Sequence, residues 1–413
     1  MRRRGVPIRA HRRALRAAVA WVSVFAALIA CTLVAVPAPY VATVAAAGAS
    51  GGPCALPRTR AHHSEGTDSW DSAYPRPRKS LDAVMVFLSF PDSGPLLGAG
   101  EVAADYNPAT SRFFDRASYG RFSLRIHAVR RWFRMPAASS SYEIRRDWDA
   151  GRRSRYLHDA IAAADGGVDF SAYDMVYLVA DPHAPGVDSD ATKVVNLAEP
   201  IHADGTVVRR LVTLFENHPP DRNVLAHETG HVFDLPDLYY RPPAGSHADW
   251  DTHVGDWDLM GSQFGLAPDP FAWHKWRLGW LTQGQVRCVP RTGTSWHELT
   301  PLEVPGGTKL LVLRTGPDSA LAIEARAALG NDAGLCTQGV LLYRVRSDLQ
   351  SGDGPVEVLD AHPKTSACLG TSVYPPLANA PLGLGDSYVF GRTHITVTNR
   401  TRDGAWSVRV SDV

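Results

Sequence analysis

The chain has 413 residues, of which 43 are basic, 42 are acidic and 45% are hydrophobic. This length allows two domains with substantial cores. Seven basic residues and no acidic residue lie in the first 47, so the rest holds 36 basic and 42 acidic residues, a net charge of −6. That balance does not indicate a basic surface for nucleic acid, and we expect no nucleic-acid partner.

The first 49 residues have the pattern of an export signal. Seven arginines precede an uncharged stretch at residues 17–36, and small residues follow. We predict that residues 1–49 are a signal peptide cleaved after Ala47 or Ala49, which leaves a secreted chain with no stable membrane association. Two alternatives stay open, an uncleaved leader that anchors the chain in a membrane and lipidation at Cys31.

The rest of the chain divides by composition into three parts. Residues 50–80 are rich in glycine, proline, serine and charge, and we expect an extended lead-in there, not a folded inhibitory prodomain. Residues 81–281 alternate between strand and helix patterns, which predicts an α/β (α+β) domain with a mixed sheet. Residues 282–413 hold short apolar or alternating runs between turn residues, which predicts a β-sandwich-like domain. We expect that domain to pack against the first, with ligand binding as the alternative.

Strands, a helix and a hairpin are predicted within residues 81–281. Ala83–Phe90 and Met175–Ala180 have the composition of buried strands, and Ser154–Asp165 that of a helix ended by two glycines. Asp204 and the glycine after it lie between two apolar runs, which indicates a β-hairpin. One strand of this hairpin would form a sheet edge along which an extended peptide can be held by backbone hydrogen bonds.

The segment HETGHVFDLPD, from His227 to Asp237, places metal-ligand side chains at informative spacings. His227 and His231 are four residues apart, so a helix would present both imidazoles on one face, where they can bind one zinc ion. Asp237 would supply the third ligand after the helix ends. Glu228 would lie beside the open coordination position. The short motif alone is weak, and two surface histidines on a helix are the alternative.

The flanking sequence favours a buried helix here. Asp221 is the expected N-cap, and Val224, Leu225 and Val232 supply an apolar face. A buried helix would not carry two histidines and a glutamate without a partner for them, and a zinc ion is the partner that fits.

A second motif, GDWDLMG from Gly255 to Gly261, places Met260 in a glycine-flanked turn. An extended zinc motif followed by a methionine turn is the pattern of the metzincin-like proteases. HETGHVFDLPDLYY and GDWDLMG, with FFDRASYGRFSL upstream and FAWHKWRLGWL downstream, resemble the immune inhibitor A-type secreted metallopeptidases of bacteria. The resemblance covers residues 81–281 and the C-terminal part more loosely. It implies a metzincin-like domain with a twisted sheet and an active-site helix, and a secreted zinc endopeptidase acting on proteins or peptides.

One position departs from that family. The family has glycine three residues after the second histidine, and this chain has Asp234. A left-handed backbone is the expected requirement there, which glycine adopts freely and aspartate tolerates better than most residues. Asp234 is also a competing candidate for the third ligand, but the six-residue spacing and the resemblance favour Asp237.

The ligand set predicts the mechanism. Zinc held by two imidazoles and a carboxylate acidifies a bound water and polarises a carbonyl. Glu228 is the expected general base, taking the water's proton during attack on the peptide carbonyl and delivering a proton to the leaving amine. Met260 would form an apolar floor beneath the metal. Tyr239, Tyr240 and His253 are candidates for stabilising the oxyanion, although packing roles are the simpler interpretation.

Tryptophans and acidic residues allow two further interpretations. The chain has eleven tryptophans, which could suggest sugar stacking, but Trp257 lies in the methionine turn. Trp273, Trp276 and Trp280 have the spacing of a packed helix face, so we expect core packing. A structural calcium ion (Ca2+) is a further candidate, because four acidic residues lie close together. They are Asp249, Asp251, Asp256 and Asp258.

Four cysteines follow the predicted leader, an even number in an exported chain. Two disulfides are therefore expected. Three pairings are consistent with the sequence, and we choose Cys336 with Cys368 and Cys54 with Cys288. No spacing is that of a zinc-binding CxxC pair, so a thiolate metal site is not predicted.

Two classes of function remain. The first is a secreted zinc endopeptidase, and the second is an exported non-catalytic binding protein on a protease scaffold. Glu228 separates them, because a degraded enzyme usually loses its base or a ligand, and this chain retains His227, Glu228, His231 and Asp237. Zinc hydrolysis of a non-peptide bond is disfavoured only by the resemblance.

Overall fold

The computed structural model describes residues 52–243 and 245–412, which belong to one compact unit. The predicted signal peptide, the alternative membrane anchor and Cys31 lie outside the described residues. Within the described ranges, no helix is long and apolar enough to cross a membrane.

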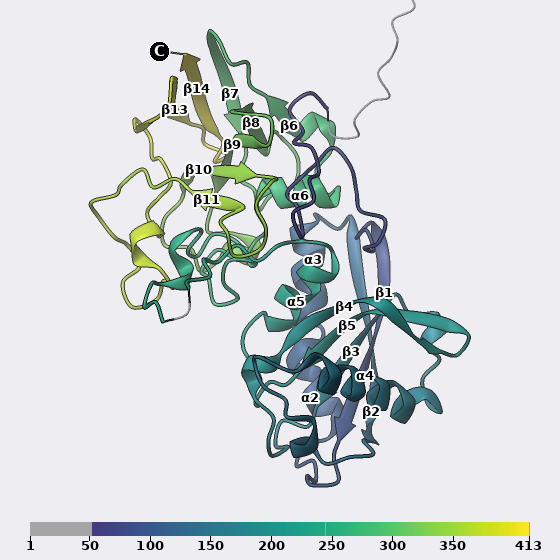
Figure 1. The fold of residues 1–413 in the computed structure, drawn as a ribbon. Coiled ribbons are helices and arrows are strands. Elements are labelled where there is room, and N and C mark those ends of the chain that lie inside the picture. The colour runs from purple at the N-terminus through teal and green to yellow at the C-terminus, as the bar shows by residue number, and fades with distance from the viewer. Residues whose placement is uncertain (1–51, 244, 413) are drawn as a thin grey trace, which may run out of the picture. The chain divides into compact units, whose positions relative to one another are not determined.

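A five-stranded sheet lies at the centre of the first half of the chain (Figure 1). Its strand order is β2-β1-β3-β5-β4, in which β2, β1, β3 and β5 run parallel and β4 pairs antiparallel with β5 at one edge. The strands are β1 (Lys79–Ser89), β2 (Phe122–Arg134), β3 (Met175–Ala180), β4 (Lys193–Ala203) and β5 (Thr206–Leu214). The predicted mixed sheet is therefore confirmed, including the two buried strands.

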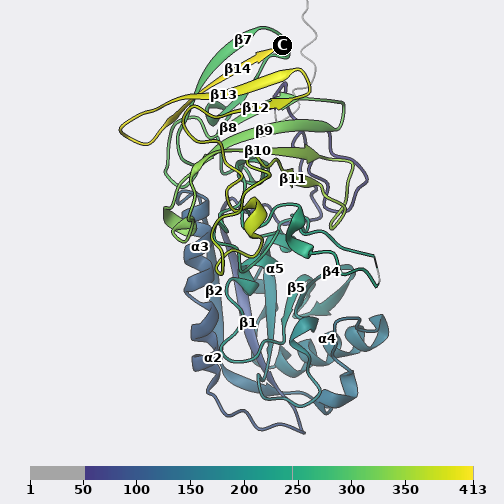
Figure 2. The same cartoon turned by 90° about the vertical axis from the view of Figure 1, so that its left-hand side faces the viewer.

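Helices cover both faces of this sheet, as Figure 2 shows. Alternate residues of β1 enter different apolar clusters, Met85 and Phe87 on one face and Val84 and Val86 on the other. The first cluster includes residues of α2 (Ala99–Tyr106), α3 (Ala109–Ala117) and α5 (Val224–Val232), and the second includes residues of α4 (Ala150–Asp165). The continuous apolar sequence of the central strands follows from burial on both faces.

The hairpin predicted at Asp204 is the β4–β5 connection. Asp204 has φ 49° and Gly205 has φ 70°, so both central residues are left-handed, as a tight two-residue hairpin turn requires. The pairing of β4 with β5 is irregular between Asn196 and Ile201. After the turn, β5 pairs with β3, which leaves β4 at the edge of the sheet.

Helix α5 carries the two motif histidines, and all nine of its residues are buried. The predicted N-cap is wrong, because the helix begins at Val224 after Asn223 in a left-handed conformation. Asp221 instead receives a hydrogen bond from Gln263 on its carboxylate, while its amide donates to Glu216. The chain thus makes one more turn before the helix than the local sequence suggests.

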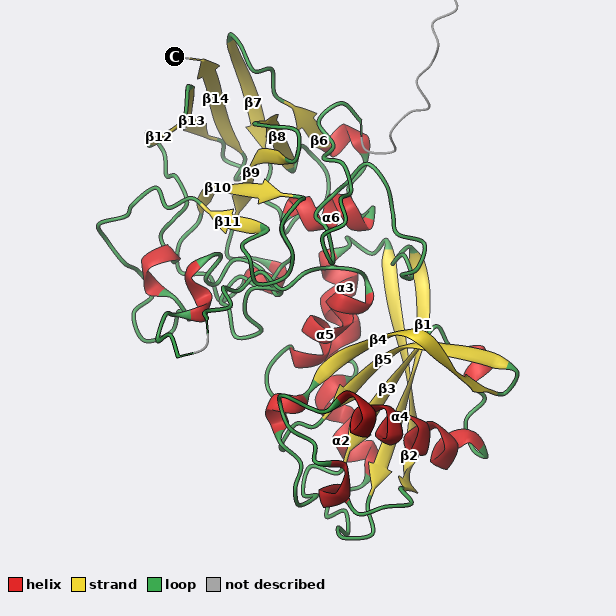
Figure 3. Ribbon diagram, viewed as in Figure 1, coloured by secondary structure: helices red, strands yellow, loops and turns green. Residues whose placement is uncertain are grey.

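The second half of the chain contains two sheets (Figure 3). Apolar side chains from both sheets form one buried cluster. This confirms a β-rich C-terminal region. The five-stranded sheet has the order β11-β10-β9-β8-β6 and the four-stranded sheet the order β12-β13-β14-β7. Their strands are β6 (Val286–Cys288), β7 (Thr294–Leu299), β8 (Leu310–Arg314), β9 (Ser319–Arg326), β10 (Gly339–Arg346), β11 (Val356–Val358), β12 (Ser387–Phe390), β13 (Thr393–Arg400) and β14 (Trp406–Asp412).

The expected core role of the tryptophans is confirmed. Trp257, Trp273 and Trp280 are almost fully buried, and Trp276 is 8% exposed. The predicted helix is α6 (Ala272–Leu278), but Trp280 lies beyond its end, because Gly279 is left-handed and terminates the helix.

Both expected disulfides are present. The Cα atoms are 5.5 Å apart in Cys54–Cys288 and 6.0 Å apart in Cys336–Cys368. Disulfides of this kind are typical of chains that fold in an oxidising compartment. The first one joins the N-terminal segment, which we define as residues 52–78, to β6.

The N-terminal segment contains no helix or strand, yet it is firmly packed. His63, Ser64 and Glu65 are at most 5% exposed. Oε1 of Glu65 lies 2.8 Å from Nε2 of His274 in α6, while Nδ1 of that imidazole lies 2.9 Å from Oδ2 of Asp258. The segment is therefore connected through a buried histidine to the turn that carries Met260.

The contacts of His274 with Glu65 and Asp258 predict that the stability of the fold depends on pH. Burial disfavours the imidazolium, but Glu65 and Asp258 outweigh that effect and raise the pKa of His274 to about 10. The folded chain therefore holds a proton that an unfolded histidine, with a pKa of about 6.5, releases. This stabilisation is complete below about pH 6.5 and disappears as the pH rises through about 10, with a total on the order of a few kcal/mol.

Urea unfolding at pH 7, 8 and 9 measures this effect. The free energy of unfolding should decrease by about 1.4 kcal/mol per pH unit through this group. In His274→Gln that slope should become shallower by the same amount. Equal slopes in both proteins would show that His274 is not protonated in the folded state.

Candidate metal centre

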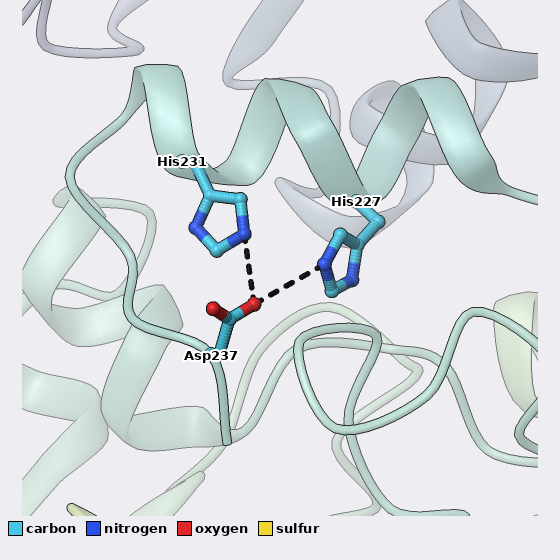
Figure 4. Close-up of side chains that lie close together, drawn as sticks. All are labelled: His227, His231 and Asp237. Atoms are coloured by element: carbon cyan, nitrogen blue, oxygen red, sulfur yellow. Dashed lines mark ion pairs between the residues drawn. The ribbon is translucent and has the colours of Figure 1, made fainter. Parts of the chain in front are cut away.

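His227, His231 and Asp237 form the one cluster among the described residues that could hold a metal ion through three such side chains. Their ligand atoms lie within 4.8 Å of one another. Figure 4 shows both imidazoles projecting from α5 toward the carboxylate, which comes from the segment after the helix. The expected juxtaposition across the end of the helix is thus present.

Backbone carbonyls fix the tautomer of both imidazoles. Nδ1 of His227 lies 2.9 Å from the carbonyl oxygen of Leu259, and Nδ1 of His231 lies 2.8 Å from that of Leu235. A carbonyl only accepts, so each Nδ1 carries the hydrogen. In the neutral rings each Nε2 therefore presents a lone pair, as a metal-binding histidine requires.

The donor set fits a divalent cation. Oδ1 of Asp237 lies 3.4 Å from Nε2 of His227 and 2.9 Å from Nε2 of His231, and it is buried without a well-oriented hydrogen bond from a described residue. Two lone pairs and a carboxylate oxygen at these separations repel one another unless a positive charge joins them. Two imidazoles and one carboxylate are zinc ligands, and they leave an open position.

The pKa shifts of His231 and Asp237 agree with a site that favours a cation. Burial disfavours a charged His231, but the adjoining carboxylate of Asp237 outweighs it and raises the pKa of His231 to about 9. Burial also disfavours a charged Asp237 and so raises its pKa, but His231 and His227 outweigh that effect and hold the pKa of the carboxyl well below its usual range. The site therefore attracts positive charge, whether a proton or a metal ion.

Asp234 has the backbone that its position demands but does not enter this cluster. It has φ 65°, as expected from its place where the resembled family has glycine. Its carboxylate is occupied by Arg58, His63 and Arg277. Of the two candidate aspartates, only Asp237 lies with the histidines.

Met260 packs directly against α5. It is fully buried, and a Cβ added at Gly230, between the two histidines, would lie 2.5 Å from its sulfur. Its amide donates to Asp258 and its carbonyl accepts from Leu238. The methionine turn thus supports both the helix and the segment that presents Asp237.

Glu228 faces the edge strand of the main sheet. Oε2 of Glu228 accepts a hydrogen bond from the Val194 amide in β4 at 2.6 Å. Burial raises the pKa of Glu228, although His227 and His231 oppose the shift. A raised pKa moves this carboxylate toward the range in which a general base is effective near neutral pH.

An open cleft of about 830 Å³ contains the cluster. Tyr239 lines it, whereas Tyr240 packs against His253 with ring centroids 5.2 Å apart. Of the three oxyanion candidates, Tyr239 is therefore the one that faces the cleft. The lining residues are Arg146, Asp147, Asp190, Thr192, Lys193, Val194, His227, Glu228, His231, Asp237, Tyr239, Arg241, Pro242 and Trp250.

The sequence did not predict two residues that form hydrogen bonds with Asp237, the candidate third ligand. Arg241 donates to Oδ2 of Asp237 at 3.1 Å, and the Asp237 amide donates to Oγ of Ser351 at 2.9 Å. Arg241 lies four residues after Asp237, but an arginine at that spacing does not by itself predict a hydrogen bond to a metal ligand. Ser351 comes from the C-terminal region, and no signal in the sequence could have identified it.

The calcium prediction gains no ligand cluster within the described ranges. The carboxylate of Asp256 accepts from the amides of Leu266 and Val373, and that of Asp258 accepts from the amide of Met260. Asp249 likewise accepts from the amide of Asp251, so three of the four carboxylates bond to backbone amides. Calcium binding at these residues stays a prediction.

No protein-family model and no curated protein matches this chain. A function is therefore inferred from the residues of the site and their geometry.

Proposed function

We propose that this chain is a secreted zinc-dependent endopeptidase whose metal is held by His227, His231 and Asp237. The observation that carries the proposal is the convergence of two Nε2 lone pairs and an unbonded carboxylate oxygen beside Glu228. The export signal predicted from the sequence and the two disulfides support an extracellular site of action.

The residues of the site take distinct roles in peptide hydrolysis. When bound, zinc supplies an acidified water and polarises the scissile carbonyl. The carboxylate of Glu228 would take one proton from the attacking water and then pass a proton to the leaving amine. Tyr239 lines the same cleft and is the side chain we assign to the substrate carbonyl oxygen during attack.

The edge strand supports an extended peptide as substrate. β4 is at the edge of the sheet, and its residues Lys193 and Val194 line the cleft together with the metal cluster. The Val194 amide is directed toward Glu228 and not toward β5. A peptide lying along this edge would place its backbone beside both the metal ligands and the base.

Metal removal tests the proposal. The chain without its leader should hydrolyse casein or a quenched peptide, lose that activity on chelation, and regain it with about one zinc ion per chain. Stoichiometric zinc binding without cleavage of any member of a peptide library would overturn the endopeptidase assignment. A non-catalytic binding protein would then be the better description. If such a chain hydrolysed esters or non-peptide amides instead, it would be a non-peptide hydrolase.

A further inference from the structure

Asp234 ends the metal-binding helix in an unusual way. The amide of Leu235 donates to the carbonyl of Gly230, and the amide of Asp234 donates to that of His231. These two bonds form the helix-terminating motif whose left-handed residue is most often glycine. Here that residue is an aspartate with φ 65° and no exposed surface.

Three donors converge on the Asp234 carboxylate. Oδ2 lies 2.6 Å from Nη1 of Arg58 and 2.6 Å from Nη2 of Arg277, and Oδ1 lies 2.8 Å from Nδ1 of His63. Arg277 is in α6, whereas Arg58 and His63 belong to the N-terminal segment. The two arginines outweigh the effect of burial and lower the pKa of Asp234, so the carboxylate is charged.

The same turn orients the metal ligands. Directly after Asp234, the carbonyl of Leu235 accepts from Nδ1 of His231 and so directs Nε2 of that ring toward Asp237. The ring of His63 is also stacked on that of His231, with centroids 5.9 Å apart. A displacement of Asp234 would therefore reach both the second and the third ligand.

We propose that Asp234, held by Arg58, His63 and Arg277, is a positioning residue that fixes His231 and Asp237 for metal binding. This inference rests on the proposed function. It makes the N-terminal segment, which is about 170 residues from the motif in sequence, part of the metal centre. A non-glycine residue in the left-handed region is strained, and the charge-assisted hydrogen bonds to the Asp234 carboxylate offset that strain.

The zinc dissociation constant of the whole chain without its leader tests this role. We expect Arg58→Met to raise the constant about tenfold, as is typical for partners that orient metal ligands, and to change the visible spectrum of the cobalt-substituted protein. Arg58→Lys should restore most of the affinity, because it returns the charge. Asp234→Asn tolerates the left-handed backbone but loses the charge, and should weaken binding at least as much.

A matched control separates this role from simple anchoring of the N-terminal segment. Arg314 holds that segment through the carbonyl of Ala55 at 2.7 Å, without a bond to Asp234. Arg314→Met should therefore keep the zinc affinity and the cobalt spectrum of the natural chain. All constants are compared well below the melting temperature of each variant.

The outcomes are distinct. If Arg58→Met and Asp234→Asn fold and keep the natural affinity and spectrum, the positioning role is wrong while the metal centre stands. If Arg314→Met weakens binding equally, the effect is general anchoring and the inference falls. Should Asp234→Asn fail to fold, Arg58→Met decides. Arg58 is one of three partners of Asp234, and its own side chain is 18% exposed, so its replacement disturbs the core less. A natural chain that binds no zinc overturns this inference and the proposed function together.

Discussion

Glu228→Gln is expected to reduce peptide hydrolysis by about a hundred- to ten-thousand-fold while zinc stays bound. The amide side chain has nearly the shape of the carboxylate, and its oxygen can still accept from the Val194 amide. It cannot take a proton from water. The loss should therefore appear in kcat, with the zinc stoichiometry and the melting temperature close to those of the natural chain.

A second buried glutamate supplies the control for this variant. Glu216 is 7% exposed and burial raises its pKa, but it does not line the cleft. Glu216→Gln should retain hydrolysis. If Glu228→Gln hydrolyses peptides as fast as the natural chain with zinc bound, Glu228 is not the base. If both variants are equally inactive, a general effect of removing a buried charge is the explanation.

Arg326→Met is expected to destabilise the fold by about 3–5 kcal/mol. Arg326 lies in β9 with no exposed surface, paired with Glu324 and Asp332. It also donates to the carbonyl of Trp257, within the methionine turn, and to that of Ala267, which follows the turn. Its removal leaves buried carboxylates and carbonyls without donors, which is the costly way to break a buried ion pair.

Urea unfolding followed by circular dichroism measures this loss. The free energy of unfolding of Arg326→Lys should lie between those of the natural chain and Arg326→Met, because lysine keeps the charge but not the planar set of donors. Arg346→Met is the exposed control: Arg346 pairs with Asp348 at 2.7 Å, with both side chains about one-third exposed, so the loss should be at most about 1 kcal/mol. Equal midpoints for Arg326→Met and Arg346→Met would show that the buried network does not stabilise the chain.

The sequence was sufficient wherever the determining interactions are local. The spacing of His227 and His231 gives one helix face at any depth in a fold, and Asp204 with its glycine gives a tight hairpin wherever its strands pair. Apolar runs were enough for β1 and β3, because strands buried on both faces need little alternation. The failures were at boundaries: Asp221 did not cap α5 and Trp280 fell outside α6, where tertiary contacts and a left-handed Gly279 decided the helix ends.

The sequence by itself therefore identified the residues of the candidate metal cluster, the proposed base and the secondary structure around them. The spacing favoured Asp237 over Asp234, and the tertiary structure placed Asp237 with the histidines, because partners from elsewhere in the chain occupy the Asp234 carboxylate. Arg58, Val194 and Ser351 reach the site from three separate segments. Such contacts form only when the whole chain has folded. Burial strengthens the interaction of a charge pair and makes an unbonded carboxylate costly, and an isolated segment provides no burial.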